Sequence, residues 1–275
     1  MFFRLLVALS FLSTLAWADP NQVLPNGRLA YYGNQDFNKS NDVKKTLFAI
    51  LNSYHQTTPG QVDRLVPGCE EGKNCYRHTS VGYNRARVII FGELDVQRDE
   101  QGQFVEEVYC RKKIYFRDAR DITRMNSIVN IEHTWPQSKF TRQFNTDLQK
   151  SDMHHLYPTD SKANGIRGNH DFGEPDPGFT NNALCDASQI ERVGGGYIFA
   201  PPAEHRGNVA RSLFYFSVRY QMPIDAKQER TLREWHEQDP IDAEEIERHN
   251  LIARHQKVRN PFVDHPHLVT MIGDF

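Results

Sequence analysis

The chain has 275 residues, of which 25 % are charged and 39 % hydrophobic, with 17 Phe, 11 Tyr and 3 Trp. This composition is typical of a globular protein and excludes a disordered chain, a collagen-like repeat and a polytopic membrane protein. The formal net charge is −2, from 33 Lys and Arg against 35 Asp and Glu. A nucleic-acid partner would therefore have to bind to a local basic patch.

The first eighteen residues predict a secretory signal. Arg4 gives a positive start, and Leu5 to Leu15 form an apolar run that is too short to span a bilayer. Small residues at Ala16 and Ala18 suit a signal peptidase, and we expect cleavage after Ala18. The mature protein is then expected to be soluble, secreted or periplasmic, and without a membrane partner. An uncleaved anchor or a buried N-terminal helix is the alternative.

The four cysteines of an exported chain are expected to form disulfides, because an even number of cysteines in an oxidising compartment suggests them. Cys69 and Cys75 flank a polar, turn-forming stretch that would let them meet, which would leave Cys110 and Cys185 to pair. Four cysteines allow three pairings, and the sequence does not choose among them. A four-cysteine zinc site is the alternative, but the C-x-x-C pairs that it needs are absent.

Residues 19–275 show no repeat and no low-complexity linker, so we expect one domain. Residues 19–40 are polar, contain Pro and Gly, and predict an extended N-terminal arm. A helix is expected to begin at Ser40 or Asn41, because apolar residues then recur at helical spacing. Residues 99–102 indicate a turn, and residues 105–109 alternate as a strand would.

Two charged regions follow. Residues 111–124 hold six cations against Asp118 and Asp121, a local charge of +4, interleaved with aromatic residues. Such a stretch could neutralise phosphates, although an ordinary charged surface would look the same. The expected nucleic-acid contacts are Arg111, Lys112, Lys113, Arg117, Arg120 and Arg124. Residues 228–259 alternate in charge along a helical pattern, which is typical of a solvated helix face.

Two short segments between residues 130 and 169 concentrate His, Asn, Asp and Glu. In the second segment, Leu156 and Tyr157 suit a short strand ended by Pro158, and Asp160 or Ser161 can cap a helix that runs through Arg167. Asn164 and Arg167 are three residues apart and would share a face of that helix.

The first segment contains the neighbours Glu132 and His133, which would face opposite sides of a regular strand. Both could reach one site only where the backbone is irregular. Glu132 and Asn164 offer oxygen atoms, which suit a hard cation such as Mg²⁺ that keeps several waters. His133 has a pKa near neutrality and could take a proton from water.

These segments together resemble the bacterial endonuclease I family. The likeness lies in Glu132-His133-Thr134-Trp135-Pro136, in Asp152 to Thr159 and in Asn164-Gly165-Ile166-Arg167-Gly168-Asn169, and it extends over most of residues 80 to 268. The family consists of exported nucleases with a ββα-metal motif. The resemblance implies an α+β fold, a mixed and irregular single domain built around that motif.

The resemblance also implies the roles of the matching residues. One Mg²⁺ would bind Glu132 and Asn164, His133 would be the general base, and Arg142 or, second, Arg167 would hold the phosphate. His154, His155 and Asn169 would support the site. The implied protein is a monomeric endonuclease that cuts DNA with little sequence preference and leaves 5′-phosphate ends, with RNA left open as a substrate.

Two other functions stay open on the sequence. A zinc hydrolase could use His133, His154 and His155, although neither H-E-x-x-H nor H-x-x-E-H occurs in the chain. A non-catalytic exported protein could bind nucleic acid through residues 111–124 alone.

Overall fold

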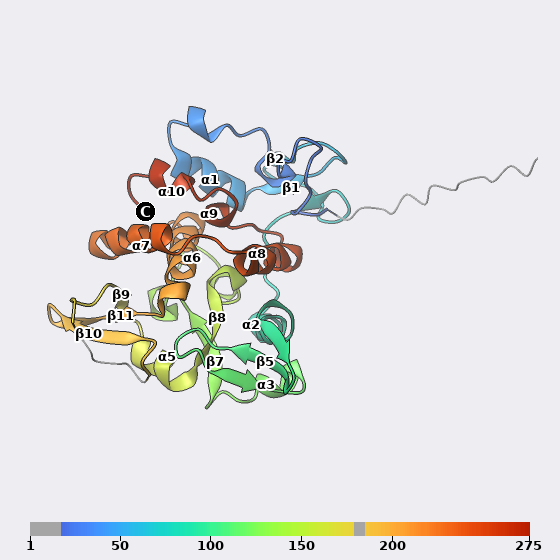
Figure 1. Ribbon diagram of the computed structural model, residues 1–275. Coiled ribbons are helices and arrows are strands. Elements are labelled where there is room, and N and C mark those ends of the chain that lie inside the picture. Colours follow the sequence, from blue (N-terminus) through green and yellow to red (C-terminus); the bar gives the residue numbers. More distant parts are fainter. Residues whose placement is uncertain (1–17, 179–184) are drawn as a thin grey trace, which may run out of the picture.

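The computed structural model describes residues 18–178 and 185–275 (Figure 1). The signal expected at residues 1–18 lies outside this part of the chain, apart from Ala18. Among the described residues, no helix has both the length and the apolar character that a membrane crossing needs.

The structure is a mixture of helices and small sheets, which confirms the expected α+β class. The α-helices are α1 (Val43–Asn52), α2 (Tyr83–Ile89), α3 (Ala119–Ile122), α4 (Thr146–Lys150), α5 (Ser161–Arg167), α6 (Arg206–Tyr220), α7 (Ala226–Gln238), α8 (Ala243–Gln256), α9 (Pro261–Asp264) and α10 (Leu268–Met271). Short 3₁₀ turns are η1 (Ala30–Tyr32), η2 (Phe37–Lys39), η4 (Gln137–Lys139), η5 (Met153–His155) and η6 (Ala203–His205), and η3 (Ile90–Leu94) is a π-helical turn.

The described strands form four separate sheets. Three have three strands, in the orders β2-β1-β3, β4-β5-β6 and β10-β11-β9, and the fourth is the antiparallel pair β7-β8. The strands are β1 (Tyr54–Gln56), β2 (Arg64–Val66), β3 (Cys75–Tyr76), β4 (Val96–Asp99), β5 (Gly102–Glu106), β6 (Lys113–Tyr115), β7 (Val129–His133), β8 (Leu156–Asp160), β9 (Asp171–Phe172), β10 (Gln189–Val193) and β11 (Gly196–Ala200).

Helix α6 runs through the middle of the larger hydrophobic core and lies between α7 and α8 in Figure 1. Nearly all of its residues are buried, since it is covered by α1, α7 and α9. A helix that is buried all round needs apolar side chains on every face, and α6 supplies them with Leu213, Phe214 and Phe216. A second, smaller core lies between α2, η3 and the β7-β8 pair and includes Ile90, Ile131 and Leu156.

The N-terminal segment differs from the expected extended arm. Residues 30–32 and 37–39 form η1 and η2, and Tyr31 and Tyr32 are buried in the larger core. The Tyr32 hydroxyl donates to Asp264, far away in the sequence. Burying two aromatic rings stabilises the docked segment more than its polar neighbours destabilise it.

Several local expectations are confirmed, with shifted boundaries. Helix α1 begins at Val43, slightly later than expected, because the Asp42 side chain caps it by accepting from Lys45 N. The turn at residues 99–102 joins β4 to β5. The expected end of the strand at Pro158 is wrong: β8 continues to Asp160, because both strands of a two-stranded sheet are edge strands, where a proline is tolerated.

The charged segment 228–259 forms α7 and α8, but it is less solvated than expected. Glu229, Glu245 and Arg248 are buried, and each has an oppositely charged partner: Arg233, Arg211 and Asp95 respectively. Buried charges must be paired in this way, and sequence periodicity does not reveal partners on other elements.

The structure contains two disulfides. One joins the cysteines that flank the turn at residues 70–74, as expected, and the other joins the remaining two. Cys69 is bonded to Cys75 and Cys110 to Cys185. The described residues contain no free cysteine, and the pairing leaves no thiol for a four-cysteine zinc site.

Candidate active site

The site is built on strand β7. Its ladder to β8 is regular as far as His133, with Glu132 opposite Tyr157 and His133 opposite Leu156. The irregular backbone expected at this point is therefore not observed. Side chains alternate along a regular strand, so Glu132 and His133 lie on opposite faces of the pair, with α5 beside Glu132 and α2 beside His133.

Helix α5 begins and ends as its sequence predicts. The Asp160 side chain caps it by accepting from the backbone N–H groups of Lys162 and Ala163. Gly168 follows the last turn with φ of 57°, a conformation that glycine adopts at little cost. Asn164 and Arg167 both reach toward β7 from this helix, which confirms that they share a face.

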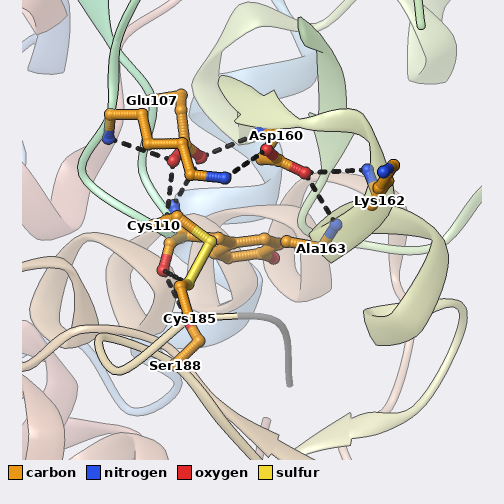
Figure 2. Close-up of a disulfide and its surroundings, with 9 residues drawn as sticks. Glu107, Cys110, Asp160, Lys162, Ala163, Cys185 and Ser188 are labelled. Carbon is orange, nitrogen blue, oxygen red and sulfur yellow. Dashed lines mark hydrogen bonds and ion pairs between the residues drawn. A yellow bond between two sulfur atoms is a disulfide. The ribbon is translucent and has the colours of Figure 1, made fainter. Parts of the chain in front are cut away.

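Hydrogen bonds connect the loop that follows β5 to the start of α5, as Figure 2 shows. The carboxylate of Glu107, which is fully buried, accepts backbone N–H groups of Tyr109, Cys110, Lys112 and Asp160. The Cys110–Cys185 disulfide and a hydrogen bond from Ser188 Oγ to the Tyr109 carbonyl hold the other side of the loop. This bonding fixes Tyr109, whose hydroxyl lies beside the Glu132 carboxylate.

The Glu132 carboxylate is buried and paired with Arg167. Arg167 Nη1 lies 2.9 Å from Glu132 Oε1, and both side chains are about 2 % exposed. Burial raises the pKa of Glu132, and the Arg167 guanidinium and the Tyr109 hydroxyl oppose that rise because they favour the charged carboxylate.

Arg167 does not have the exposed position that a phosphate contact needs. Its Nη1 donates to the carbonyl of His133, its Nη2 donates to that of Thr134, and the guanidinium lies over the Phe172 ring. The structure thus gives Arg167 a positioning contact with Glu132 and the end of β7, in place of the expected phosphate contact.

Asn164 presents its amide oxygen. The amide nitrogen donates to Asn130 Oδ1 at 2.8 Å and to the Ile131 carbonyl at 3.4 Å, both on β7. Because these bonds fix the nitrogen toward the strand, the oxygen is directed away from them. It accepts no hydrogen bond from any residue of the described chain, and the side chain is only half-buried.

The residues around Glu132 fit a hydrated divalent cation. Within the described residues, two buried side chains beside Glu132 have a polar atom that lacks a protein partner with good hydrogen-bond geometry, the Tyr109 hydroxyl and Arg167 Nε, and Thr134 Oγ1 and Thr159 Oγ1 on the neighbouring chain segments lack one too. Buried polar groups without protein partners are usually satisfied by water or an ion. One carboxylate and one amide oxygen are also the donors that Mg²⁺ takes when it keeps most of its waters.

His133 is held in one tautomer. Its Nε2 lies 3.1 Å from the carbonyl oxygen of Lys150, which can only accept, so Nε2 carries the proton. Nδ1 then has the free electron pair, and the exposed Gln137 amide approaches it at 3.3 Å. Burial among Tyr83, Phe140 and His155 lowers the pKa of His133 to about 4, so the ring is neutral at pH 7.

The neighbouring histidines support the structure. His154 is bonded through Nε2 to the Val258 carbonyl and His155 to the Gln149 carbonyl. With His133 bonded to Lys150, each ring directs its Nε2 to a different backbone carbonyl, which is not the arrangement of a zinc site. In the described part of the chain, no cluster of three His, Cys, Asp or Glu could hold a metal ion. Asn169 is exposed and makes a long hydrogen bond to Ser138.

The predicted cations fall into two groups. Arg142 is exposed on the loop before α4 and makes no ion pair within the described residues. In the basic segment 111–124, Arg111 is paired with Glu106 and Glu204, Lys112 with Asp160, and Lys113 with Asp99. Arg124 lies 3.6 Å from Asp121, and Arg117 and Arg120 have no acidic partner in the described structure. Much of the local charge of +4 is therefore compensated by neighbours from elsewhere in the sequence.

Sequence reasoning gave no role to three residues that contact the site. Tyr109 touches Glu132, Tyr83 lies beside the His133 ring, and the Lys150 carbonyl sets the His133 tautomer. The Tyr109-Cys110 pair offered a signal, because a disulfide fixes its neighbours. The Lys150 contact is made by the backbone and therefore leaves no side-chain pattern to find.

The endonuclease I family matches residues 71–267, which are most of the chain and include every residue of the site. The chain belongs to the endonuclease I family.

Individual relatives of this endonuclease I family member are diverse. It is similar to an extracellular ribonuclease of Bacillus subtilis, with 36 % identity over 50 % of this chain and 51 % of the relative. It is also similar to an extracellular deoxyribonuclease of Aeromonas hydrophila, with 30 % identity over 42 % of this chain and 49 % of the relative. Endonuclease-1 of Buchnera aphidicola is 24 % identical over 70 % of this chain and 86 % of the relative. The chain spans about half the length of the Bacillus and Aeromonas relatives.

Proposed function

We propose that this chain is a secreted or periplasmic, Mg²⁺-dependent endonuclease that hydrolyses phosphodiester bonds of DNA, and of RNA as a second substrate. Export is supported by the sequence of residues 1–18 and by relatives named extracellular, and the two substrates by relatives named for DNA and for RNA. The observation that carries the proposal is the match of the endonuclease I family to residues 71–267, which include Glu132, His133 and Asn164. Glu132 and Asn164 lie on the α5 side of β7, and His133 lies on the opposite face with its Nε2 on the Lys150 carbonyl. Because His133 is the last residue of β7, both faces border the end of the strand, where the scissile phosphate would lie.

His133 is the general base of the proposed reaction. The Lys150 carbonyl holds Nε2–H, so Nδ1 is the atom that takes a proton from water. The deprotonated water attacks phosphorus in line with the 3′ oxygen, which leaves a 5′-phosphate and a 3′-hydroxyl. Because burial keeps the ring neutral, His133 is in its basic form at neutral pH.

Glu132 and Asn164 would hold the Mg²⁺. When bound, such an ion supplies positive charge that offsets the negative charge building on the phosphate oxygens. Arg167 pairs with the Glu132 carboxylate and favours its charged form, and Asn130 directs the Asn164 amide oxygen outward. Among the predicted cations, the free guanidinium of Arg142 stays our candidate for the phosphate contact.

Digestion of plasmid DNA and of an RNA transcript, with Mg²⁺ and with a chelator, tests the proposal. Cleavage is expected only with Mg²⁺, and Glu132→Ala, His133→Ala and Asn164→Ala should each abolish most of it. Glu100→Ala and His267→Ala are matched controls, since both residues are exposed. Titration calorimetry should show weakened Mg²⁺ binding for the Glu132 and Asn164 variants and unchanged binding for the His133 variant.

Two outcomes would contradict the proposal. Restoration of a chelator-treated sample by zinc and not by magnesium would favour the zinc hydrolase. Salt-sensitive binding without cleavage under any metal would favour a non-catalytic nucleic-acid-binding protein.

A further inference from the structure

One unassigned cation lies beside His133. The carbonyl of Lys150 binds His133 Nε2, so the backbone of Lys150 directly adjoins the base. Its ammonium nitrogen lies 4.9 Å from the centroid of the Tyr83 ring, and that ring is 5.4 Å from the His133 ring. The Lys150 charge is therefore held on the rim of the site, and it is close enough to act electrostatically on His133.

This cation has no carboxylate partner among the described residues, unlike Arg167 and Lys112, which also lie near β7. Lys150 is half-buried, and no described carboxylate forms an ion pair with it. Arg167 is buried and bonded to Glu132, and Lys112 is paired with Asp160 at the start of α5. Arg87, one turn after Tyr83, lies over the same ring at 5.9 Å, but its guanidinium is bonded to the Thr123 carbonyl and to Asn126. The Lys150 ammonium lies closer to that ring, at 4.9 Å, and donates no hydrogen bond to any of the described residues. Lys150 is thus a cation that a strand passing His133 on the α2 side would meet.

The Tyr83 ring determines where the ammonium lies. A cation over an aromatic face is held by the ring quadrupole, which restricts a flexible lysine side chain without neutralising its charge. A carboxylate at the same place would restrict the lysine equally but would also remove its attraction for phosphate. The pair therefore presents a localised positive charge with its ability to bind an anion intact.

We propose that Lys150, held against Tyr83, binds a backbone phosphate of the substrate strand next to the phosphodiester that is attacked by the water that His133 deprotonates. Tyr83 is a positioning residue that acts through Lys150. The subsite contacts phosphate only and so does not distinguish DNA from RNA. The inference rests on the proposed function, because it places a nucleic-acid strand beside His133.

The test is binding of a fluorescent single-stranded oligonucleotide in chelator, measured by anisotropy at several salt concentrations. Lys150→Met should weaken binding about 3- to 10-fold and reduce the slope of log K against log salt by about 0.7, the value for one lost phosphate contact on a single strand. Lys150→Arg, which keeps the charge, should bind like the parent. Lys45→Met, an exposed lysine on α1, is the matched control and should change neither quantity.

The Tyr83 variants separate positioning from folding. Tyr83→Phe keeps the ring and should bind like the parent, whereas Tyr83→Leu should weaken binding about two- to threefold. Thermal unfolding checks that each variant is folded, and a misfolded Lys150→Met leaves Lys150→Gln for the same measurement. In cleavage assays Lys150→Met should raise KM more than it lowers kcat, because its carbonyl still orients His133.

Equal salt slopes for Lys150→Met and the parent would overturn the subsite. Because binding is measured without metal, the result is independent of catalysis. A chain that binds through Lys150 but never cleaves would contradict the proposed function and leave the subsite. A chain that cleaves normally, but whose oligonucleotide affinity and salt slope do not change in Lys150→Met, would support the proposed function and contradict the subsite.

Discussion

The two faces of strand β7 give the neighbouring residues Glu132 and His133 different electrostatic environments. On one face, Glu132 meets the Arg167 guanidinium and the Tyr109 hydroxyl. On the other face, His133 meets the rings of Tyr83 and Phe140 and a backbone carbonyl. Both side chains are buried, but only the carboxylate has a counter-charge.

This difference determines which protonation state each residue keeps. Burial disfavours the charged form of both, so it raises the pKa of Glu132 and lowers that of His133. Arg167 opposes the effect for Glu132, so the pKa of the carboxyl rises less than burial alone would cause. For His133 the nearby charges of Lys150 and Arg167 add to the effect, which keeps the imidazole neutral and able to accept a proton.

The largest expected effect comes from the His133 face. His133→Ala removes the atom that accepts a proton, and a positioned base contributes about 10²- to 10⁴-fold to a rate. Turnover measured on plasmid DNA with Mg²⁺ should fall by at least that factor, while oligonucleotide affinity should be nearly unchanged. Near-full activity would show that the base lies elsewhere.

The next largest effect is expected when the ion pair on the Glu132 face is broken. Arg167→Met leaves a buried carboxylate without its counter-charge, which should lower the free energy of unfolding by about 3–5 kcal/mol. Urea denaturation measures this loss. Arg211→Met, at the buried pair with Glu245, is a matched control that should lose similar stability. Only Arg167→Met should also weaken Mg²⁺ binding in calorimetry, and equal effects of both variants would deny Arg167 a role at the metal.

A pH titration of stability sharpens the contrast between the faces. The pKa of His133 is lowered to about 4 in the folded protein, below its usual value of 6.5. Its neutral form therefore stabilises the fold fully above pH 6.5, and this contribution, about 2–3 kcal/mol, is lost as the pH falls toward 4. Between pH 7 and pH 4.5, the free energy of unfolding should fall less for His133→Ala than for the parent. The other buried histidines are present in both proteins, so their contributions cancel in this comparison. Identical pH slopes would mean that His133 is not buried as described.

The smallest effect concerns the contact at His133 Nδ1. Gln137→Ala removes a long, partly buried hydrogen bond, while the Lys150 carbonyl still holds the ring. Activity should therefore stay within about threefold of the parent, as expected for a single weak hydrogen bond. A loss of a hundredfold would instead show that Gln137, and not the carbonyl, orients the base.

Much of the local structure around the site was predictable. Asp160 before Ser161 marks the start of α5, Gly168 marks its end, and the spacing from Asn164 to Arg167 puts both on one face. The turn between Cys69 and Cys75 likewise favoured a bond between these two cysteines, although the sequence left three pairings open and the structure decided among them. In each case the deciding interaction lies within a few residues along the chain.

Other features were not predictable, because their partners come from distant elements. The cations of residues 111–113 were expected to face phosphate, but carboxylates from β4, β5, β8 and η6 compensate them. The N-terminal arm was expected to be extended, but Tyr31 and Tyr32 dock it on the core. Arg167 was expected at a phosphate, and its burial against Glu132 follows only from the packing of α5 on β7.

The sequence by itself determined the type of chemistry: a carboxylate, an amide and a histidine, with the local signals that place them on a strand and a helix. The tertiary structure alone decided which of these groups is charged, which nitrogen carries the proton and which cations remain free. Residue types and short-range spacing specify what a side chain can do, whereas burial and long-range partners specify its state, because desolvation and Coulomb forces depend on neighbours in space.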